Sequence, residues 1–474
     1  MNTVDKINSK EYLEKHIKIQ PQKIIKDSNN KKKSKCRCFF ISICCTITII
    51  LAVIIFIFLF IGFPTFTGKE RSKKRKISAE DFEKAKYNTF LKLNNVQYPT
   101  SRQNYYYKDE YLSSFYNFRY IFFNKLNFKD FSTISLYNVL INIYMGISDE
   151  ELAKTLDDIL GLNETERILF YSQIIQNNYF KDSNSEIKIS NGGFYNSDNV
   201  KEKKSFVDKL TETYTECYKL SYRKDFNYII DWINKSVKEK DFTNKDIFGN
   251  LENTSLLLVS TLYYQQNWKC KFIDSKMYKG PFYINKNKIK EVKFMNHKYT
   301  VNYYFDYEDY YSFHDFYSNE YTINYLVPKS KDNNILELIK DKNFLYEKQE
   351  VEGPIVINLS VPKFKREINL DIIPILKELG LEKLFDRNDS TFNNPFIIEE
   401  NKNYYVDKVF QKNRFDLNED GTTIKSITFA SSNIFVKSAG EKEINIELDR
   451  PFIYIIKDRN RLPIFIGYID DPDN

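Results

Sequence analysis

Side chains suited to acid–base, nucleophilic or metal chemistry are sparse and scattered in this sequence. The chain of 474 residues has three histidines, His16, His297 and His314, and none stands at a metal-ligand spacing. No serine or cysteine lies in a nucleophile-elbow pattern, and His314 in its run of tyrosine and phenylalanine is typical of a packing or surface residue. The sequence therefore predicts no enzyme, no catalytic residue, no metal and no cofactor.

The charges are distributed unevenly. Residues 1–102 hold 21 Lys/Arg against 8 Asp/Glu, whereas the rest of the chain holds 50 against 56. The net charge of +7 thus belongs to the N-terminal region, and the rest is mildly acidic. Nucleic-acid binding needs a clustered basic face. Because zinc-finger spacings and glycine-rich phosphate loops are also missing from the sequence, we expect no nucleic-acid partner.

An apolar run near the N-terminus predicts a membrane anchor. Residues 39–63 form a continuous stretch without a charge, long enough to cross a bilayer as a helix. A signal-peptide core is shorter, about 7–15 residues, and ends at small residues. We therefore divide the chain into a basic cytosolic tail (1–38), a transmembrane helix (39–63), a charged linker or stalk (64–102) and a folded domain (103–474).

The orientation of this anchor rests on weaker signals, because basic clusters flank both of its ends. A short N-terminal tail and a long following domain favour a type II signal anchor, with the domain extracellular or lumenal. Five glycosylation sequons fit an outside domain, although an asparagine-rich chain supplies such sequons by chance. They begin at Asn163, Asn234, Asn253, Asn358 and Asn388.

Other signals beside the anchor and in the domain leave alternatives open. Cys36 and Cys38 fit palmitoylation or unpaired cytosolic thiols. The basic run 73–76 fits either a protease site that would shed the domain or a solvated end of the helix. In the domain, Cys217 and Cys270 fit two free thiols better than a disulfide.

Hydrophobic periodicity predicts helices early in the domain and strands later. Helices are expected at 111–126, at 134–144 with Gly146 as a stop, and at 148–160 with a capping box of Ser148 and Glu151. Strands are expected at 255–264, 321–327, 354–361, 404–417 and 451–456. The domain is therefore predicted to be of the α+β class.

Several short motifs, in order, resemble the serpins, a family of protease inhibitors, across residues 103–474. The motifs are FSTIS (131–135) with Gly146, LLVSTLYY (257–264) with Trp268, VPK (327–329), VPKF (361–364), LKELGL (376–381), EDGT (419–422), RPF (450–452) and FIG (465–467). The resemblance implies helices packed on large mixed sheets with a mobile reactive-centre loop. After a protease cuts this loop, it enters the main sheet as a new strand and traps the protease.

The resemblance also implies roles for particular residues. Glu419, Gly421, Thr422 and Ile424 would form the hinge of the loop, and glycine supplies backbone freedom there. The region where the sheet opens would include Ser132, Ser135, Ser260, Trp268 and Gln411.

This sequence departs from the family pattern at both places. Inhibitory members carry small residues after the Gly-Thr pair, whereas this chain has Ile424, which would face the sheet interior, and Lys425, which would stay in solvent. In the sheet-opening region, Ser260 replaces Asn, Gln411 replaces His, Thr133 replaces Pro and Gln266 replaces Gly.

Counting the family's usual spacing from Glu419 places the cleaved bond at Phe435–Val436, which suits a chymotrypsin-like protease. The loop is longer than usual, and a shifted register at Lys437 would suit a trypsin-like protease; an exposed phenylalanine without a protease partner is the alternative. The sequence thus predicts a monomeric, membrane-anchored inhibitor of a serine protease. A non-inhibitory binding, chaperone or carrier module at a membrane surface remains the second hypothesis.

Overall fold

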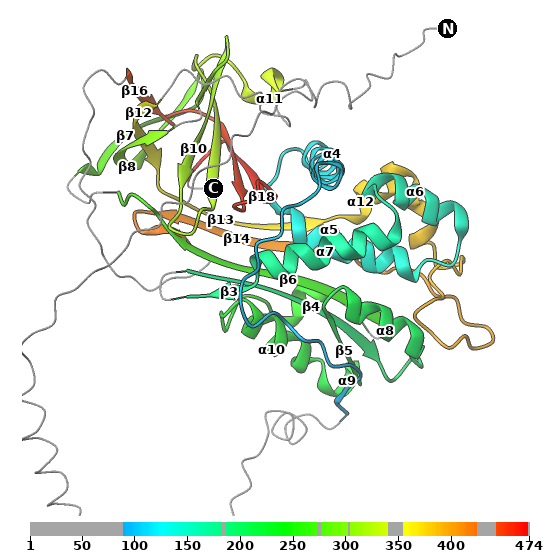
Figure 1. Cartoon of the computed structure of the whole chain (residues 1–474). Helices are drawn as coiled ribbons and strands as arrows, with labels where there is room; N and C mark the ends of the chain where they lie inside the picture. Colours follow the sequence, from blue (N-terminus) through cyan, green and yellow to red (C-terminus); the bar gives the residue numbers. More distant parts are fainter. Residues whose placement is uncertain are drawn as a thin grey trace, which may run out of the picture. The chain divides into compact units, whose positions relative to one another are not determined.

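The computed structural model describes residues 89–182, 185–249, 251, 253–272, 276–301, 304–339, 354–423 and 442–472 (Figure 1). The predicted anchor at 39–63, the hinge residue Ile424 and the predicted bond Phe435–Val436 lie outside these residues. Among the described residues, no helix combines the length and the apolar character that crossing a membrane requires.

An eight-stranded main sheet runs through the domain (Figure 1). Its strand order is β1-β5-β4-β6-β15-β14-β13, and β3 pairs with β4 at one side. The strands are β1 (Leu91–Lys92), β3 (Phe180–Lys181), β4 (Ser185–Asn196), β5 (Thr215–Leu220), β6 (Leu256–Asn267), β13 (Phe364–Asp371), β14 (Phe410–Asn418) and β15 (Gly421–Thr423).

Two smaller sheets complete the β structure. The second sheet has the order β2-β18-β17-β11-β10-β9, from β2 (Phe131–Ser132), β9 (Tyr304–Asp306), β10 (Tyr310–Phe316), β11 (Thr322–Pro328), β17 (Phe452–Lys457) and β18 (Pro463–Ile469). The third has the order β16-β12-β8-β7, from β7 (Tyr278–Asn285), β8 (Lys288–Val301), β12 (Ile355–Pro362) and β16 (Lys442–Glu447). The strands β15 and β16 flank residues 424–441, so the loop predicted from sequence connects the main sheet to the third sheet.

Helices cover both faces of the main sheet. The helices α5 and α7 lie on one face and α10 on the other (Figure 1). Their bounds are α4 (Asp109–Lys125), α5 (Thr133–Gly146), α6 (Glu150–Leu160), α7 (Glu164–Asn178), α8 (Lys204–Glu212), α9 (Tyr222–Asp225), α10 (Asn227–Ser236), α11 (Ile335–Leu338) and α12 (Ile373–Leu376). Short helical turns follow at η1 (Lys245–Phe248), η4 (Lys377–Leu381) and η5 (Glu382–Phe385).

The predicted elements are largely confirmed, with shifts at their ends. The three predicted helices correspond to α4, α5 and α6, and the five strands to β6, β11, β12, β14 and β17. The capping box at Ser148 was wrong by one residue, because Asp149 caps α6 by accepting from the backbone N–H of Leu152. The strand predicted from 404 begins only at Phe410. Cys217 and Cys270 are both free.

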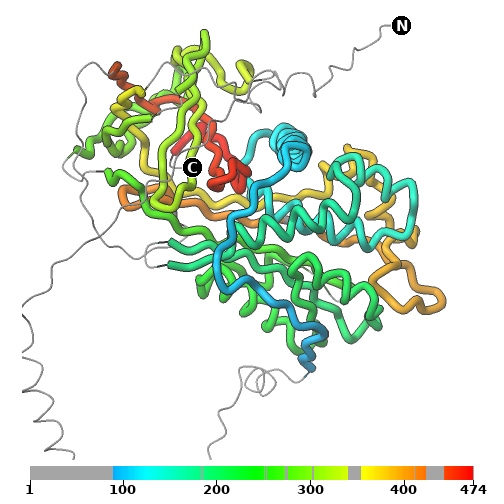
Figure 2. Tube along the Cα trace, in the orientation of Figure 1, coloured from blue at the N-terminus to red at the C-terminus, as the bar shows by residue number. Residues whose placement is uncertain are grey.

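An extended segment, residues 89–107, packs along the domain before the first helix; we call it the strap. Within it, β1 pairs antiparallel with the edge strand β5, with Leu91 opposite Lys219. From β1 the strap runs along the domain to α4 (Figure 2). Packing therefore begins before Gln103, inside the segment that the sequence assigned to the stalk.

Candidate functional site: the hinge strand and the slot of the main sheet

The short strand β15 is seated between two long strands of the main sheet. It pairs antiparallel with β6, with Thr422 opposite Gln266, and antiparallel with β14, with Thr422 opposite Leu417. Because β15 is antiparallel to both neighbours, β6 and β14 run parallel to each other. Thr422 and Gln266 are fully buried, so this strand is part of the packed sheet.

A tyrosine and a tryptophan hold β15 from the side of the core. The hydroxyls of Thr422 and Tyr317 lie 2.5 Å apart. The Tyr317 ring stacks on Trp268, with centroids 4.7 Å apart and planes at 13°. The Trp268 indole N–H donates to the carbonyl of Asn418 at 2.8 Å, and its backbone N–H donates to Asp420 at 3.1 Å. Trp268 thus binds the turn between β14 and β15.

Glu419 stands at this turn and forms an ion pair with Lys363. Burial alone would raise the pKa of Glu419, but the hydrogen bond from Lys363, a backbone hydrogen bond and the charges of Lys363 and Lys293 together outweigh it, and the pKa lies below its ordinary value. The carboxylate is therefore charged at neutral pH and links the start of the hinge to the segment between β12 and β13.

Below β15 the main sheet contains a slot. In the described residues no ladder joins β6 directly to β14; the two strands are connected only through the short strand β15. Three cavities of about 40, 60 and 50 Å³ follow one another along this line. All three are lined by residues of β6 on one side and by residues between 403 and 414 on the other. The slot thus continues the line of β15 down the sheet.

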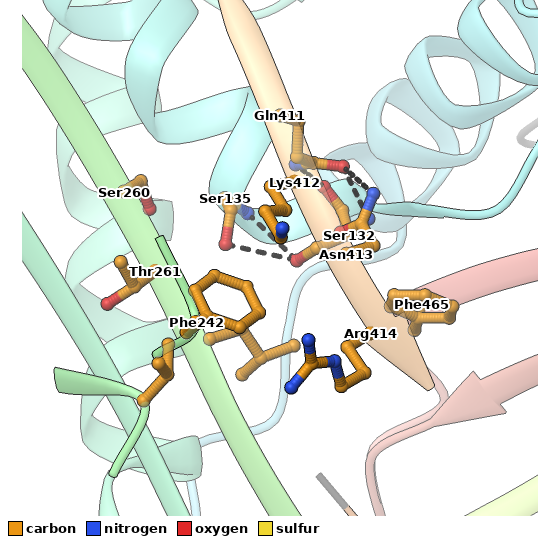
Figure 3. A pocket seen from close by; sticks show the side chains of 12 residues that line it. Ser132, Ser135, Phe242, Ser260, Thr261, Gln411, Lys412, Asn413, Arg414 and Phe465 are labelled. Atoms are coloured by element: carbon orange, nitrogen blue, oxygen red, sulfur yellow. Dashed lines mark hydrogen bonds between the residues drawn. The ribbon is translucent and has the colours of Figure 1, made fainter. Parts of the chain in front are cut away.

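Three of the predicted sheet-opening residues meet at one wall of the slot (Figure 3). The Gln411 side chain accepts from the backbone N–H of Ser132 at 2.9 Å and donates to its carbonyl at 3.0 Å. The Ser132 hydroxyl donates to that of Ser135 at 3.0 Å and caps α5. Gln411 therefore clamps β14 to β2 and to the N-terminus of α5.

Ser260 belongs to the opposite wall and does not join this cluster. Its hydroxyl donates to the side-chain carbonyl of Asn191 on β4 at 2.8 Å. Asn191 is fully buried and donates in turn to the Tyr171 hydroxyl and to the carbonyl of Thr213. The structure thus separates Ser260 from Ser132, Ser135 and Gln411 across the slot, while Trp268 lies at the upper end.

Sequence reasoning missed several residues of this site. Tyr317, which contacts Thr422, carries no local signal because its partner is 105 positions away in the chain. Asn191 did carry a local sequence signal, because it precedes Gly192 and Gly193, and glycines inside a strand often mark a close approach of another backbone segment. Asp130, whose backbone carbonyl accepts from the Asn413 side chain at 3.1 Å, was missed as well.

Gln266 is buried beside Thr422 with neither its amide nitrogen nor its amide oxygen hydrogen-bonded to the described residues. Replacing an unsatisfied buried polar group by an apolar one of similar shape removes its desolvation penalty. We expect Gln266→Met to raise the free energy of unfolding by about 1–3 kcal/mol in urea titrations. The control is Gln265→Met on the opposite face, where the side chain accepts from the Tyr263 hydroxyl and no gain is expected. A Gln266→Met variant no more stable than the wild type would contradict this explanation.

Asp130 carries a buried carboxyl immediately before β2. Its Oδ1 accepts from the backbone N–H of Tyr468 at 3.1 Å, and Arg366 lies 3.7 Å from its Oδ2. Burial raises the pKa of Asp130 to about 6, although Arg366 and the Tyr468 N–H act in the opposite direction. The native state therefore holds this proton more tightly than the unfolded chain.

This shift predicts a pH-dependent loss of stability. The contribution from protonated Asp130 is fully present below about pH 4 and is lost as the pH rises through about 6. Two pKa units correspond to about 3 kcal/mol. The Asp130→Asn variant keeps an acceptor for Tyr468, and we expect it to gain about 3 kcal/mol relative to the wild type between pH 4 and 7. Urea titrations at both pH values measure this difference, and parallel pH profiles would refute it.

Comparison with known proteins identifies the family. A family model described as serpin (serine protease inhibitor) matches residues 115–472. The leukocyte elastase inhibitor of Equus caballus is 27% identical over 261 residues, which cover 53% of this chain. This match spans 66% of the horse protein, slightly less than two thirds of its length.

Solved structures share the fold at lower identity. The native state of the thermophilic serpin tengpin has a TM-score of 0.66 at 19% identity, covering 80% of this chain and 97% of that chain. Thyroxine-binding globulin in complex with thyroxine has a TM-score of 0.62 at 20% identity, covering 78% and 100%. The chain therefore belongs to the serpin family, whose model is described as serine protease inhibitor.

Proposed function

We propose that this chain inhibits a serine protease by offering residues 424–441 for cleavage and then inserting the cut strand into the slot. The observation that carries this proposal is β15, which already occupies the position of the inserted strand between β6 and β14. Glu419, Gly421 and Thr422 act in this proposal as the hinge, with Ile424 as the next residue to enter.

The slot has the length that such an insertion needs. In the register of β15, the next residue would lie opposite Tyr264, and nine positions of β6, from Tyr264 to Leu256, would receive the strand. A strand antiparallel to both neighbours fills the backbone donors and acceptors of both edges. At about 1 kcal/mol for each net hydrogen bond, the insertion would release on the order of 10 kcal/mol, enough to drive a large conformational change.

The same register supports the predicted cleavage position. Phe435 lies twelve positions after Thr423, three more than the nine positions that β6 offers. A protease bound covalently at Phe435 would therefore be carried past the end of the slot, away from the hinge. We propose Phe435–Val436 as the bond for a chymotrypsin-like protease, and Lys437 as the residue that a trypsin-like protease would select.

A non-inhibitory binding, chaperone or carrier role is the second candidate, and the neighbours of the next hinge position favour it. In register, Ile424 would lie between Tyr264 and Phe415, both of which are 1% exposed. Forcing extra volume into a fitted interior costs about 1–3 kcal/mol. Insertion slowed in this way would let the protease complete hydrolysis and leave.

Gel electrophoresis under denaturing conditions separates these functions. The full chain in detergent is mixed with chymotrypsin and separately with trypsin, and Phe435→Gly and Lys437→Gly test the register. A covalent complex with chymotrypsin that Phe435→Gly abolishes is the expected result. A cut loop with a large gain in thermal stability but no complex would indicate a substrate, and a cut loop without that gain would favour the binding module.

We further propose that residues 39–63 anchor the chain in a membrane, with the serpin domain on the extracellular or lumenal side. The long uncharged run and its basic flanks support this proposal. The lipid bilayer would then be a second partner, and cleavage in the run 73–76 would release the domain.

Glycan attachment tests the orientation because the sequons differ in access. Asn163, Asn253, Asn358 and Asn388 are exposed, whereas the buried Asn234 donates from its amide nitrogen to the carbonyls of Lys240 and Thr243. In a eukaryotic host we expect a mobility shift on treatment with peptide-N-glycosidase F. Asn388→Gln should reduce it and Asn234→Gln should not. Complete absence of the shift would argue against the outside orientation.

A further inference from the structure

His297 lies where the three sheets meet. It belongs to β8 of the third sheet, and its ring faces β10 of the second sheet and the segment that directly follows β6 of the main sheet. We call this segment, residues 268–272, the tryptophan segment. His297 is 3% exposed, and its ring packs against Phe272 with centroids 4.0 Å apart and against Tyr299 at 4.7 Å. A titratable side chain is thus enclosed at the junction.

Both nitrogen atoms of the His297 ring face acceptors. Nδ1 lies 2.9 Å from the backbone carbonyl oxygen of Cys270, and Nε2 lies 2.9 Å from Oδ2 of Asp315. A neutral imidazole carries a single N–H and donates to one acceptor only, whereas the imidazolium ion carries an N–H on each nitrogen. The geometry therefore fits the charged ring, which serves Cys270 and Asp315 together.

The carboxylate of Asp315 depends on this charge. Asp315 is 1% exposed, and its other oxygen, Oδ1, accepts from the backbone N–H of Phe316 at 2.7 Å. Removing one partner of a buried ion pair is strongly destabilising, because it leaves an uncompensated buried charge. Loss of the His297 proton has this effect on Asp315. The contact between β8 and β10 therefore weakens as the pH rises.

Four other ionisable side chains surround the ion pair and stay neutral around neutral pH. Burial raises the pKa of each, and the negative charge of Asp315 raises it further. They are the thiol of Cys270 and the phenols of Tyr299, Tyr317 and Tyr325. Lys269 acts in the opposite direction on the pKa of the thiol, without reversing it. Imidazole is the side chain whose charge changes between about pH 5 and 8, so among these groups His297 is the one that can switch.

The ion pair is connected to the hinge strand through Trp268 and Tyr317. Cys270 lies two positions after Trp268, and Asp315 lies two positions before Tyr317. The backbones of Trp268 and Tyr317 form a bridge, and their rings stack. Trp268 binds the turn before β15, and Tyr317 contacts Thr422 within it. The charge of the imidazole ring therefore acts on both residues that hold β15.

We propose that His297 is a pH-dependent lock on the hinge strand β15. In its charged form the ring ties the tryptophan segment and β10 to the third sheet, and β15 stays seated. In its neutral form the ring releases one of these contacts, and β15 loosens. The lock is thus closed at acidic pH and opens as the pH rises. That this loosening regulates the trapping of a protease rests on the proposed function.

The fluorescence of Trp268 as a function of pH tests the lock in the full chain in detergent. Trp232 is the only other tryptophan in the sequence, so a Trp232→Phe background isolates the signal. Between about pH 5 and 9 we expect one transition, with stronger quenching of Trp268 by acrylamide on the alkaline side. His297→Gln should abolish the transition. Asp315→Asn should move its midpoint at least one pH unit lower, because the ring loses the negative charge that favours its protonation.

The matched control is His314→Gln, which removes the neighbour of Asp315 in β10 and should keep the transition and its midpoint. A wild type without a transition, or a transition that survives in His297→Gln, would overturn the lock. If His297→Gln does not fold, the midpoint in Asp315→Asn decides, and an unchanged midpoint would overturn the lock.

A second measurement separates the lock from the proposed function. Covalent complex formation with chymotrypsin is compared between the wild type and His297→Gln at about pH 6.5 and 8.5, so that the pH dependence of the protease cancels. We expect the wild type to be at least threefold faster at the lower pH, a barrier difference of about 0.6 kcal/mol, and equal at the higher pH. A ratio that does not change with pH would overturn the regulation. Absence of any complex would overturn the proposed function, and the fluorescence profile would still decide the lock.

Discussion

Replacing Gly421 by alanine is expected to expel β15 from the main sheet and to lower the yield of covalent protease complex at least tenfold. A Cβ atom at this position would lie 2.1 Å from the backbone oxygen of Gln266 and 2.9 Å from the Cα of Asn267. Both atoms belong to the backbone of β6, so no side-chain rotation relieves the overlap. The strand β15 must therefore leave its place, and the hinge can no longer lead the cut loop into the slot.

The structure offers a matched control for this substitution. Gly193 lies in β4 of the same sheet, and a Cβ there would make only ordinary contacts of 3.5 Å with Cys217 and Leu210. Gly193→Ala should therefore form the complex like the wild type. The fluorescence of Trp268, which binds the turn before β15, reports the loss of the hinge strand in Gly421→Ala. An unchanged spectrum together with a full yield of complex would show that β15 is not needed for trapping.

The order of elements in the domain was predictable because its signals are local. The buried helix α5, the amphipathic α6 and the long strand β6 each show their own periodicity within a few turns or residues. Their ends were less certain: Asp149 and Ser148 are both good caps, and only the geometry of the turn decides between them. The order of strands in the main sheet is set by contacts between distant segments, so no local pattern predicts it.

The candidate site was predictable only in part, for the same reason. The sequence placed Glu419, Gly421 and Thr422 at a hinge, but the seating of β15 depends on Tyr317, more than a hundred positions earlier. Gln411 and Ser260 were grouped by resemblance, yet one faces Ser132 and the other Asn191 on opposite sides of the slot. Lys425, which the sequence predicts to stay in solvent, lies outside the described residues.

Residues 89–102 of the strap were not predicted to be part of the folded domain. The sequence assigned these residues to a linker, because the stretch from 69 to 102 is charged, polar and only weakly periodic. Its side chains nevertheless satisfy buried backbone groups of the domain. Asn94 donates to the carbonyl of Thr215 at 3.0 Å and accepts from the N–H of Cys217 at 2.7 Å. Tyr98 donates to Tyr214 and stacks on Tyr179 at 4.7 Å.

The upper half of the strap reaches a different part of the molecule. Arg102 donates to the carbonyl of Asn177 at 3.1 Å, and its guanidinium lies over the rings of Phe180 and Tyr321. The Tyr107 hydroxyl donates to the buried carboxylate of Asp458 at 2.8 Å. The strap thus joins the edge strand β5 to α7 and to the turn between β17 and β18. If the slot opens by separation of β6 from β14, the contacts of the strap would resist this movement.

A chain that begins at Gln103 should consequently be less stable than one that begins at Ile77 by at least about 3 kcal/mol. In the shorter chain several buried backbone groups lose hydrogen-bond partners, and each such bond contributes about 1 kcal/mol. The urea midpoints of the two chains measure the difference, and Asn94→Ala in the longer chain should reproduce part of it. Asn95→Ala, at an exposed position of the strap, is the control and should leave the urea midpoint unchanged. If both chains unfold at the same urea concentration, the strap does not contribute to the stability of the domain. If the shorter chain also takes up a synthetic peptide of residues 424–435 into the main sheet faster, the strap resists opening of the sheet and helps to hold the slot closed.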